Sequence, residues 1–103
     1  MKEIKKIILL LLIISIKSDE TIDFSSLSSG TGYTVSDNTV TISTAGTYTL
    51  KGTNTNKSIL VSSSSTLIFD SLTLSSSGSL TPLIIDSSNS VTMTLSGTST
   101  LTD

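Results

Sequence analysis

Acidic side chains at the ends of apolar runs are the residues of this sequence best suited to bind a metal ion. Asp70 and Asp86 each end an apolar run and begin a turn, and Asn89 follows three residues after Asp86. Calcium takes six to eight oxygen ligands, mostly carboxylates and carbonyls. If these turns stack along one edge of the fold, the three side chains predict a calcium site. The alternative is that each aspartate caps its own turn by a local hydrogen bond.

Aromatic side chains suggest a second kind of site, because sugar rings pack against exposed aromatic faces. Tyr33 lies in the turn that leads into the repeats described below, and it is the predicted ligand-binding aromatic. Tyr48 alternates with threonines in a run that ends at Leu50, so we expect it in the core. Asn56 begins an Asn-Lys-Ser sequon in a predicted loop, which is a glycosylation site only if the source is a eukaryote.

The residue types that are absent argue against several functions. The chain has no Cys, His, Trp or Arg, so it lacks the commonest general base, thiolate metal ligands and the bidentate phosphate clamp. Beyond residue 18, two lysines face seven acidic residues, a net charge of −5 that excludes a nucleic-acid-binding patch. A glycosidase needs two carboxylates in distinct acid and base roles, and no neighbouring residue in the sequence distinguishes Asp70 from Asp86 in this way, so we expect no enzymatic activity.

The N-terminus carries a predicted export signal. Residues 1–18 combine Lys2, Lys5 and Lys6 with an apolar run over residues 7–16. That run is about half the roughly 20 residues of a membrane-spanning helix. The pattern predicts a helical signal peptide cleaved after Ser18, which places the remainder outside the cell or on its surface. The alternative is an uncleaved, membrane-associated N-terminus, which would also place the remainder of the chain outside the cell.

The chain has 23 Ser and 18 Thr, and nearly all of them lie beyond residue 18, so the remainder is very rich in hydroxyl groups. Residues 19–32 form a polar cap segment in which Phe24 and Leu27 are expected to cover the first layer of the fold. Residues 33–103 alternate between apolar and hydroxyl side chains in short runs separated by turn residues, which is typical of strands. The predicted strands are 33–35, 39–43, 47–50, 58–61, 66–69, 72–74, 83–86, 91–95 and 99–101.

These runs repeat. Residues 59–67 match residues 83–91 at an offset of 24, and residues 72–74 match residues 99–101 after a slip of three. The match predicts four stacked pairs: Ile59 on Leu83, Val61 on Ile85, Leu67 on Val91 and Phe69 on Met93. Residues 39–50 follow the same plan, and they predict Ile42, Phe69 and Met93 one above another.

A unit of three short strands in roughly 24–27 residues is typical of a β-solenoid coil. The sequence therefore predicts an all-β fold in which about three coils stack over residues 33–103. Slips of a few residues would fall in turns, where loops absorb them. A small antiparallel sandwich is the competing fold, because it too has many short strands at regular spacing.

The stretch 32–103 resembles a family of carbohydrate-binding, pectate-binding β-helix proteins. The resemblance rests on the opening GYTVSDNTVTISTAGTYTLKGT, the middle STLIFDSLTL and the closing SNSVTMTLSGTSTLTD. It implies a right-handed parallel β-helix of the pectate-lyase type, polysaccharide binding without cleavage, and bound calcium. Family members are usually longer, so the chain would supply only about the first three coils. Serine replaces many turn Asp and Gly residues of the family, which weakens the implied calcium site.

Two functions remain open from the sequence. The first is a secreted or surface module that binds a pectin-like or other polysaccharide. The second is a structural or adhesive surface protein that associates with itself, because an uncovered coil end offers unpaired backbone groups to a neighbour.

Overall fold

The computed structural model describes residues 18–76, 80–86 and 88–103, so the predicted signal segment lies outside the described residues. Over this part of the chain the regular elements are all strands. No helix long and apolar enough to cross a membrane occurs there. The strands are β1 (Ser18–Asp23), β2 (Tyr33–Val35), β3 (Thr39–Ile42), β4 (Gly46–Thr55), β5 (Ser58–Val61), β6 (Ser65–Ser75), β7 (Leu83–Ile85), β8 (Val91–Ser96) and β9 (Thr100–Thr102).

The strands form two sheets. The long sheet has the order β1-β4-β6-β8, with β9 also paired to β6, and the short sheet has the order β2-β3-β5-β7. Every pairing is parallel except that of β2 with β3. Parallel pairing across two facing sheets rules out the antiparallel sandwich.

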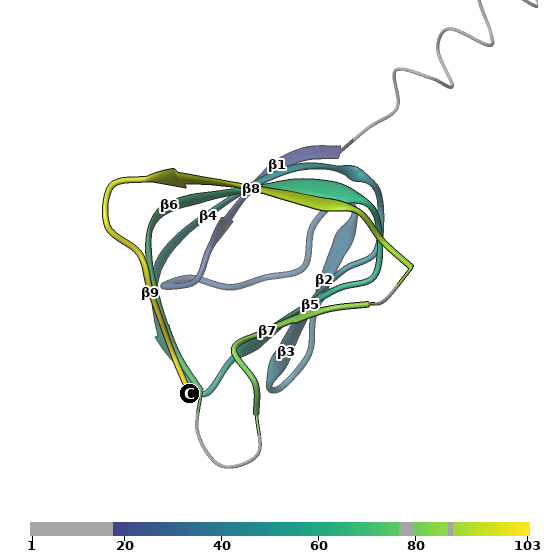
Figure 1. Cartoon of the computed structure of the whole chain (residues 1–103). Coiled ribbons are helices and arrows are strands. Elements are labelled where there is room, and N and C mark those ends of the chain that lie inside the picture. Colours follow the sequence, from purple (N-terminus) through teal and green to yellow (C-terminus); the bar gives the residue numbers. More distant parts are fainter. Residues whose placement is uncertain (1–17, 77–79, 87) are drawn as a thin grey trace, which may run out of the picture.

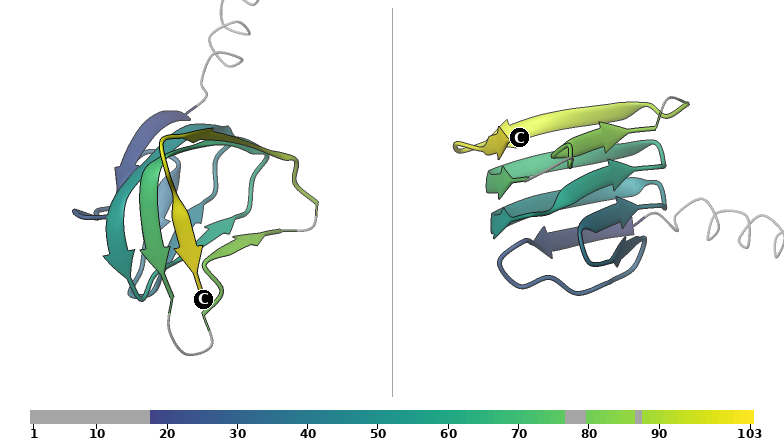
Figure 2. Two further views of the ribbon diagram at one scale, coloured as in Figure 1. Left: turned by 60° about the vertical axis from the view of Figure 1, so that its left-hand side comes forward. Right: turned by 90° about the horizontal axis from the view of Figure 1, so that it is seen from below.

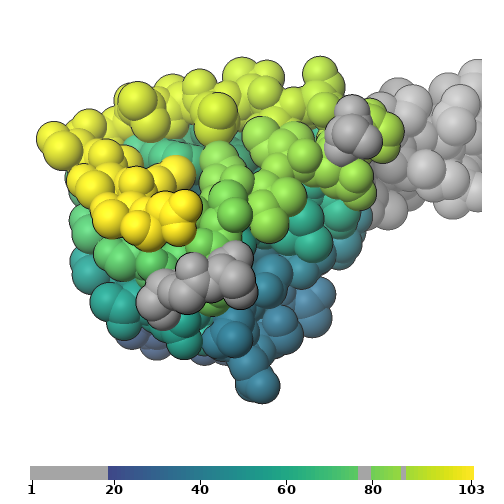
Figure 3. Space-filling view, turned by 60° about the horizontal axis from the view of Figure 1, so that its bottom comes forward, coloured from purple at the N-terminus to yellow at the C-terminus, as the bar shows by residue number. Residues whose placement is uncertain are grey.

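The chain winds as a right-handed β-solenoid of about three coils, as the sequence predicted. Seen along the axis in Figure 1, the chain runs counterclockwise through the short sheet, the long sheet and β9, and later coils lie nearer the viewer. Figure 2 shows the coils from the side as a stack, with β8 and β9 at one end and β1 at the other. The space-filling view in Figure 3 shows the same stack as successive layers.

One corner of the solenoid is built by residues with positive φ. Gly52 (φ 91°), Ser71 (φ 52°) and Gly97 (φ 75°) follow the first halves of β4 and β6 and the end of β8. The register of β4 with β6 shifts at this corner, because Ser71 is an extra residue between the paired positions. Gly52 in β4 and the Ser71 bulge in β6 turn these long strands from one side of the solenoid onto the next.

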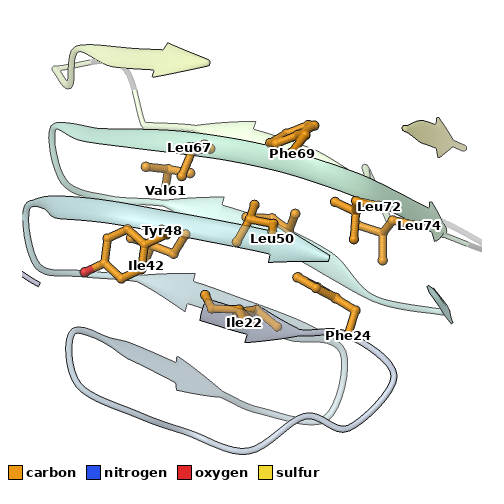
Figure 4. Packing of buried hydrophobic residues seen from close by; sticks show 12 residues of the cluster. Ile22, Phe24, Ile42, Tyr48, Leu50, Val61, Leu67, Phe69, Leu72 and Leu74 are labelled. Atoms are coloured by element: carbon orange, nitrogen blue, oxygen red, sulfur yellow. The ribbon is translucent and has the colours of Figure 1, made fainter. Parts of the chain in front are cut away.

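Apolar side chains alternate inward and form one continuous core (Figure 4). Residues paired in register on successive coils form ladders. The clearest ladder runs Ile22, Leu50, Phe69 and Leu95. The fully buried members of the core come from both sheets: Ile22, Phe24, Val40, Ile42, Tyr48, Leu50, Ile59, Val61, Leu67, Leu72 and Leu74.

The predicted stacking is partly right. Ile59 pairs with Leu83 and Val61 with Ile85, and residues 73–74 pair with 100–101, as predicted. Leu67 pairs with Met93 rather than Val91, and Phe69 with Leu95 rather than Met93. The cause is the corner before β8, where residues 86–90 replace the shorter link 62–64 of the preceding coil.

The predicted ladder of Ile42, Phe69 and Met93 is therefore wrong. Ile42 lies in the short sheet and pairs with Val61, whereas Phe69 lies in the long sheet. The predicted coil length is also too uniform. Val40 pairs with Ile59, 19 residues later, so the coil that contains β3 and β4 is shorter than the predicted 24–27 residues. Its turn between β4 and β5 is tighter than the link between β6 and β7.

The polar cap segment contains a strand that the sequence did not reveal. β1 pairs in parallel with β4, although Ile22 is its only apolar residue. Phe24 and Leu27 do pack against the core as expected, with Phe24 fully buried. Strands β4 and β6 are longer than predicted because each continues through the Gly52 or Ser71 corner.

Candidate functional site

A shallow groove crosses three coils at the corner where the chain passes from the short sheet to the long sheet. Its volume is about 220 Å³. The chain turns this corner on the right-hand side of Figure 1, at the start of β4, β6 and β8. The groove is lined by small residues from successive coils: Ala45, Gly46, Thr47, Ser64, Ser65, Thr66, Ser90 and Thr92.

The groove follows directly from the corner sequences. Short links of Ser, Thr and Ala turn the chain with little side-chain volume, which leaves an open hollow at this corner. Beside the hollow, Thr47, Thr66 and Thr92 pair in register on β4, β6 and β8. Their hydroxyl groups thus form one row along the solenoid axis, with a spacing of about 4.8 Å between strands.

Hydrogen bonds fix the walls of the groove. The Ser65 amide donates to the Ser90 carbonyl at 3.2 Å, and the Ser90 amide donates to Ser64 Oγ at 3.1 Å. The buried Ser65 hydroxyl lies 2.9 Å from Ser63 Oγ. These contacts tie the middle coil to the last coil. The lining therefore presents hydroxyl and backbone groups in fixed positions and has no charged side chain.

The structure brings two of the three predicted calcium ligands together. The Asn89 amide and its Nδ2 donate to the Asp86 carbonyl, at 3.1 and 3.3 Å, in the turn before β8. Asp70 lies elsewhere, at the far end of the first half of β6. Ser65, at the start of β6, is hydrogen-bonded to Ser90, the neighbour of Asn89. Asp70 is five residues, or about 16 Å of strand, further along β6 and is therefore remote from Asn89.

Acidic residues do not cluster elsewhere in the described part of the chain, where no three Asp or Glu side chains are close enough to share a metal ion. Both bonds from Asn89 go to the main-chain carbonyl of Asp86, so they close the turn but do not test whether the Asp86 carboxylate caps it. Calcium binding by Asp86 and Asn89 stays a prediction.

Tyr33 lies at the N-terminal end of the stack rather than on a flat outer face. Its ring meets the Tyr48 ring edge-on, with centroids 6.4 Å apart and planes at 88°. It also covers Gly30 so closely that a Cβ atom there would be 2.7 Å from the Tyr33 ring. Burial, with a smaller effect of Glu20, raises the pKa of Tyr33 above its ordinary value. One side of the ring is thus committed to packing, and ligand binding by Tyr33 stays a prediction.

The expectation that Tyr48 is in the core is confirmed. Its side chain is fully buried, and its hydroxyl donates to the Thr44 carbonyl at 2.5 Å. That bond holds the link 43–45 beside the groove. Asn56, the residue of the sequon, is exposed in a turn with φ of 67°, and its amide donates to the Ser75 carbonyl at 2.6 Å.

The comparison with protein families found a match over most of the solenoid. Residues 36–103, more than half of the chain, match the model of the carbohydrate-binding domain-containing protein family. The chain belongs to that family. No curated protein and no solved structure matches it.

Membership in a carbohydrate-binding family directs attention to the groove, which sequence reasoning missed. The matched region contains all of the groove residues. The four consecutive serines at 62–65 were one available signal, because so many small residues in a solenoid corner leave space unfilled. The sites predicted from the sequence rest on acidic and aromatic side chains, and neither kind lines the groove.

Proposed function

We propose that the solenoid binds a neutral polysaccharide, without cleaving it, in the groove at the corner between its two sheets. The observation that carries this proposal is the row of fixed, uncharged hydroxyl groups across three coils in a chain of a carbohydrate-binding family. Extended glycans present hydroxyl groups at regular intervals. A row that runs along the solenoid axis offers them repeated donors and acceptors.

The chemistry of the groove supports binding rather than cleavage. General acid and base catalysis requires titratable groups at the reacting bond. The lining consists of Ala, Gly, Ser and Thr, none of which titrates near neutral pH. The proposal therefore assigns no reaction to this groove.

Charge favours a neutral glycan over a pectin-like one. Residues 18–103 carry a net charge of −5, because only Lys51 and Lys57 oppose seven acidic residues. A polyuronate would be repelled by this surface at low salt. A pectin-like ligand would need calcium as a bridge, and the turn at Asp86 and Asn89 is the place proposed for it.

An extracellular location is part of the proposal, and it rests on the basic and apolar pattern of residues 1–18. Detection of the protein in culture medium or on the cell surface of its source, with residues 1–18 removed and Asp19 at its N-terminus, would support it. Retention inside the cell with Met1 still present would contradict it.

The test of glycan binding removes hydroxyl groups and preserves shape. The triple variant Thr47→Val, Thr66→Val and Thr92→Val keeps β-branched side chains while it removes the hydroxyl row. Each neutral hydrogen bond contributes about 1 kcal/mol, so we expect binding to weaken about tenfold to hundredfold. Affinity is measured on a panel of soluble and insoluble neutral glycans and polygalacturonate, with and without calcium.

A matched control exists on another side of the solenoid. Thr53, Thr73 and Thr100 also pair in register and are exposed, but none lines the groove. Their triple change to Val should leave the affinity unaltered. Equal losses in both triple variants would place the binding surface elsewhere. Absence of binding to every glycan would sink the proposed function itself.

A further inference from the structure

One apolar side chain lies on the outer face of the long sheet, close to the groove. Ile68 stands between the buried Leu67 and Phe69 in β6, so the alternation of the strand directs its side chain outward, where it is half-buried. Before the corner, the other outward side chains described in β4, β6 and β8 carry hydroxyl groups or charges: Thr47, Thr49, Lys51, Thr66, Asp70, Thr92, Thr94 and Ser96. Ile68 is therefore a single apolar position in a polar face.

This apolar position lies in the row next to the groove. Thr66, which lines the groove, precedes Ile68 by two residues and points to the same side of β6, about 6.6 Å away. Across the strands, Ile68 pairs in register with Thr49 on β4 and with Thr94 on β8, each about 4.8 Å away. Hydroxyl side chains thus surround Ile68 on three sides.

Charged side chains occupy the fourth side. Asp70 follows Ile68 by two residues on the same face and pairs in register with Lys51, and both are exposed. Their opposite charges lie on adjacent strands and offset each other. This part of the face therefore has little net attraction for a charged sugar, and it limits the uncharged surface to the groove and the row that contains Ile68.

We propose that the Ile68 side chain is a binding contact of the glycan site and packs against the C–H face of one sugar ring. This inference rests on the proposed function and adds a residue outside the groove to it. A pyranose ring carries C–H bonds on its faces and hydroxyl groups around its edge. The groove supplies polar partners for the edge, and Ile68 supplies the apolar surface for the face. Ligand sites commonly combine an apolar surface with a few placed polar groups.

A purely structural role is the competing explanation for Ile68. Its side chain could pack between the methyl groups of Thr49 and Thr94, since β-branched neighbours on adjacent strands stabilise a sheet. That role predicts a change in stability when Ile68 is replaced, but no change in glycan affinity. It also predicts no change in the heat capacity of binding, which reports the apolar surface that the ligand covers.

The test replaces the apolar side chain and keeps its branching. Ile68→Thr in the full chain should weaken glycan binding about tenfold, because the lost contact corresponds to one or two buried methyl groups. Its heat-capacity change of binding should be less negative than that of the unmodified chain. Ile68→Leu keeps an apolar side chain and should retain the affinity within about threefold. Titration calorimetry with soluble oligosaccharides of β-glucan, mannan, galactan and xylan measures these quantities.

A matched control lies on the short sheet. Leu60 is a half-buried apolar residue that points outward from β5, since its neighbours Ile59 and Val61 are buried, and it does not line the groove. Leu60→Thr makes the same kind of change on an outer face and should lower stability to a similar degree as Ile68→Thr. It should leave the glycan affinity unaltered.

The outcomes separate this inference from the proposed function. If Ile68→Thr binds as tightly as the unmodified chain while the triple Thr→Val variant of the groove is weakened, Ile68 is not a contact and the groove remains the glycan site. Equal losses in Ile68→Thr and Leu60→Thr would also overturn the role of Ile68, because the loss would follow from stability alone. If the unmodified chain binds none of the oligosaccharides or polysaccharides, the proposed function fails and this contact fails with it.

Discussion

Ile22 and Leu95 occupy the first and last places of one ladder, yet Ile22 is 1% exposed and Leu95 is 71% exposed. The two ends of the solenoid are thus built from the same pattern of inward residues but are covered differently. At the N-terminal end, Phe24 is fully buried, and Leu27 and Tyr33 pack against the core. Figure 4 shows Ile22 and Phe24 beneath Leu50, covered by the chain that leads to β2.

Hydrogen bonds hold the N-terminal cover, which includes Phe24, Leu27 and Tyr33, in place. The Phe24 amide donates to the Lys51 carbonyl at 2.8 Å, and Asn54 Nδ2 donates to the Phe24 carbonyl at 2.7 Å. The antiparallel strand β2 closes the short sheet at the same end. Terminal repeats of a solenoid need such a cover because one of their faces has no neighbouring coil. The contrast shows that a cover is a separate structure, not a consequence of the repeat.

The largest predicted difference between the two ends is the cost in unfolding free energy of shortening an inward side chain of the same ladder. Ile22→Ala removes buried methyl groups from the covered end and should reduce the free energy of unfolding by about 3 kcal/mol. Leu95→Ala occupies the same ladder at the open end and should cost less than about 0.5 kcal/mol. Urea unfolding of the two variants beside the unmodified chain measures both costs. Similar costs would mean that the last coil is covered in solution.

The corner with positive φ offers a second comparison between the ends. At Gly52 an added Cβ would lie 2.4 Å from Asp23 Oδ1 and 2.9 Å from the Ser25 backbone nitrogen, both in the N-terminal cover. At Gly97 it would meet only the Ser71 side chain within 3 Å. Both changes to Ala incur the strain of a left-handed residue, about 1–2 kcal/mol. Gly52→Ala should therefore cost about 1 kcal/mol more than Gly97→Ala, because backbone must also move.

Thermal unfolding of the two glycine variants side by side measures this difference. Asp23→Ala shortens one of the side chains that a Cβ at Gly52 would meet and should reduce the excess cost of Gly52→Ala. If Gly97→Ala were the more damaging change, the last coil would be more tightly held than its exposure indicates.

The sequence predicted the inward and outward faces well because alternation has a period of two. Val40, Ile42, Tyr48 and Leu50 are all buried as their runs indicate. The same property hid the error in the stacking of Phe69, since a slip of two residues keeps every side chain on its face. Loop length decides the ladder partner, and the two extra residues of the corner 86–90 leave no trace in the alternation.

The candidate site was less predictable for a related reason. The groove exists because small side chains fail to fill a corner, and an unfilled volume appears only when three coils are placed together. Asp70 and Asp86 both end apolar runs, so sequence alone could not tell that Asp70 lies within β6 whereas Asp86 lies in the link after β7. β1 was missed because its pairing with β4 relies on backbone bonds and a single apolar residue, Ile22.

The smallest predicted effect is the change in stability at alkaline pH that comes from ionisation of Tyr33, a titratable side chain in the N-terminal cover. Burial and, to a lesser degree, Glu20 raise the pKa of Tyr33 in the folded chain. Because the folded state holds this proton more tightly than the unfolded state, stability present below about pH 10 is lost as the pH rises through the raised pKa. Tyr33→Phe should remove that part of the alkaline loss.

The measurement is the urea midpoint at pH 8 and at pH 11 for both proteins. Tyr33 is only partly buried, so we expect the loss between the two pH values to be smaller in Tyr33→Phe by ~0.3 M urea or less. Glu20→Gln, which keeps the tyrosine and removes the neighbouring charge, should recover a minor share of that difference. If the urea midpoint falls equally in all three proteins, the Tyr33 hydroxyl is as well solvated in the folded chain as in the unfolded chain. The N-terminal cover would then exclude less water than the packing of Tyr33 on Tyr48 implies.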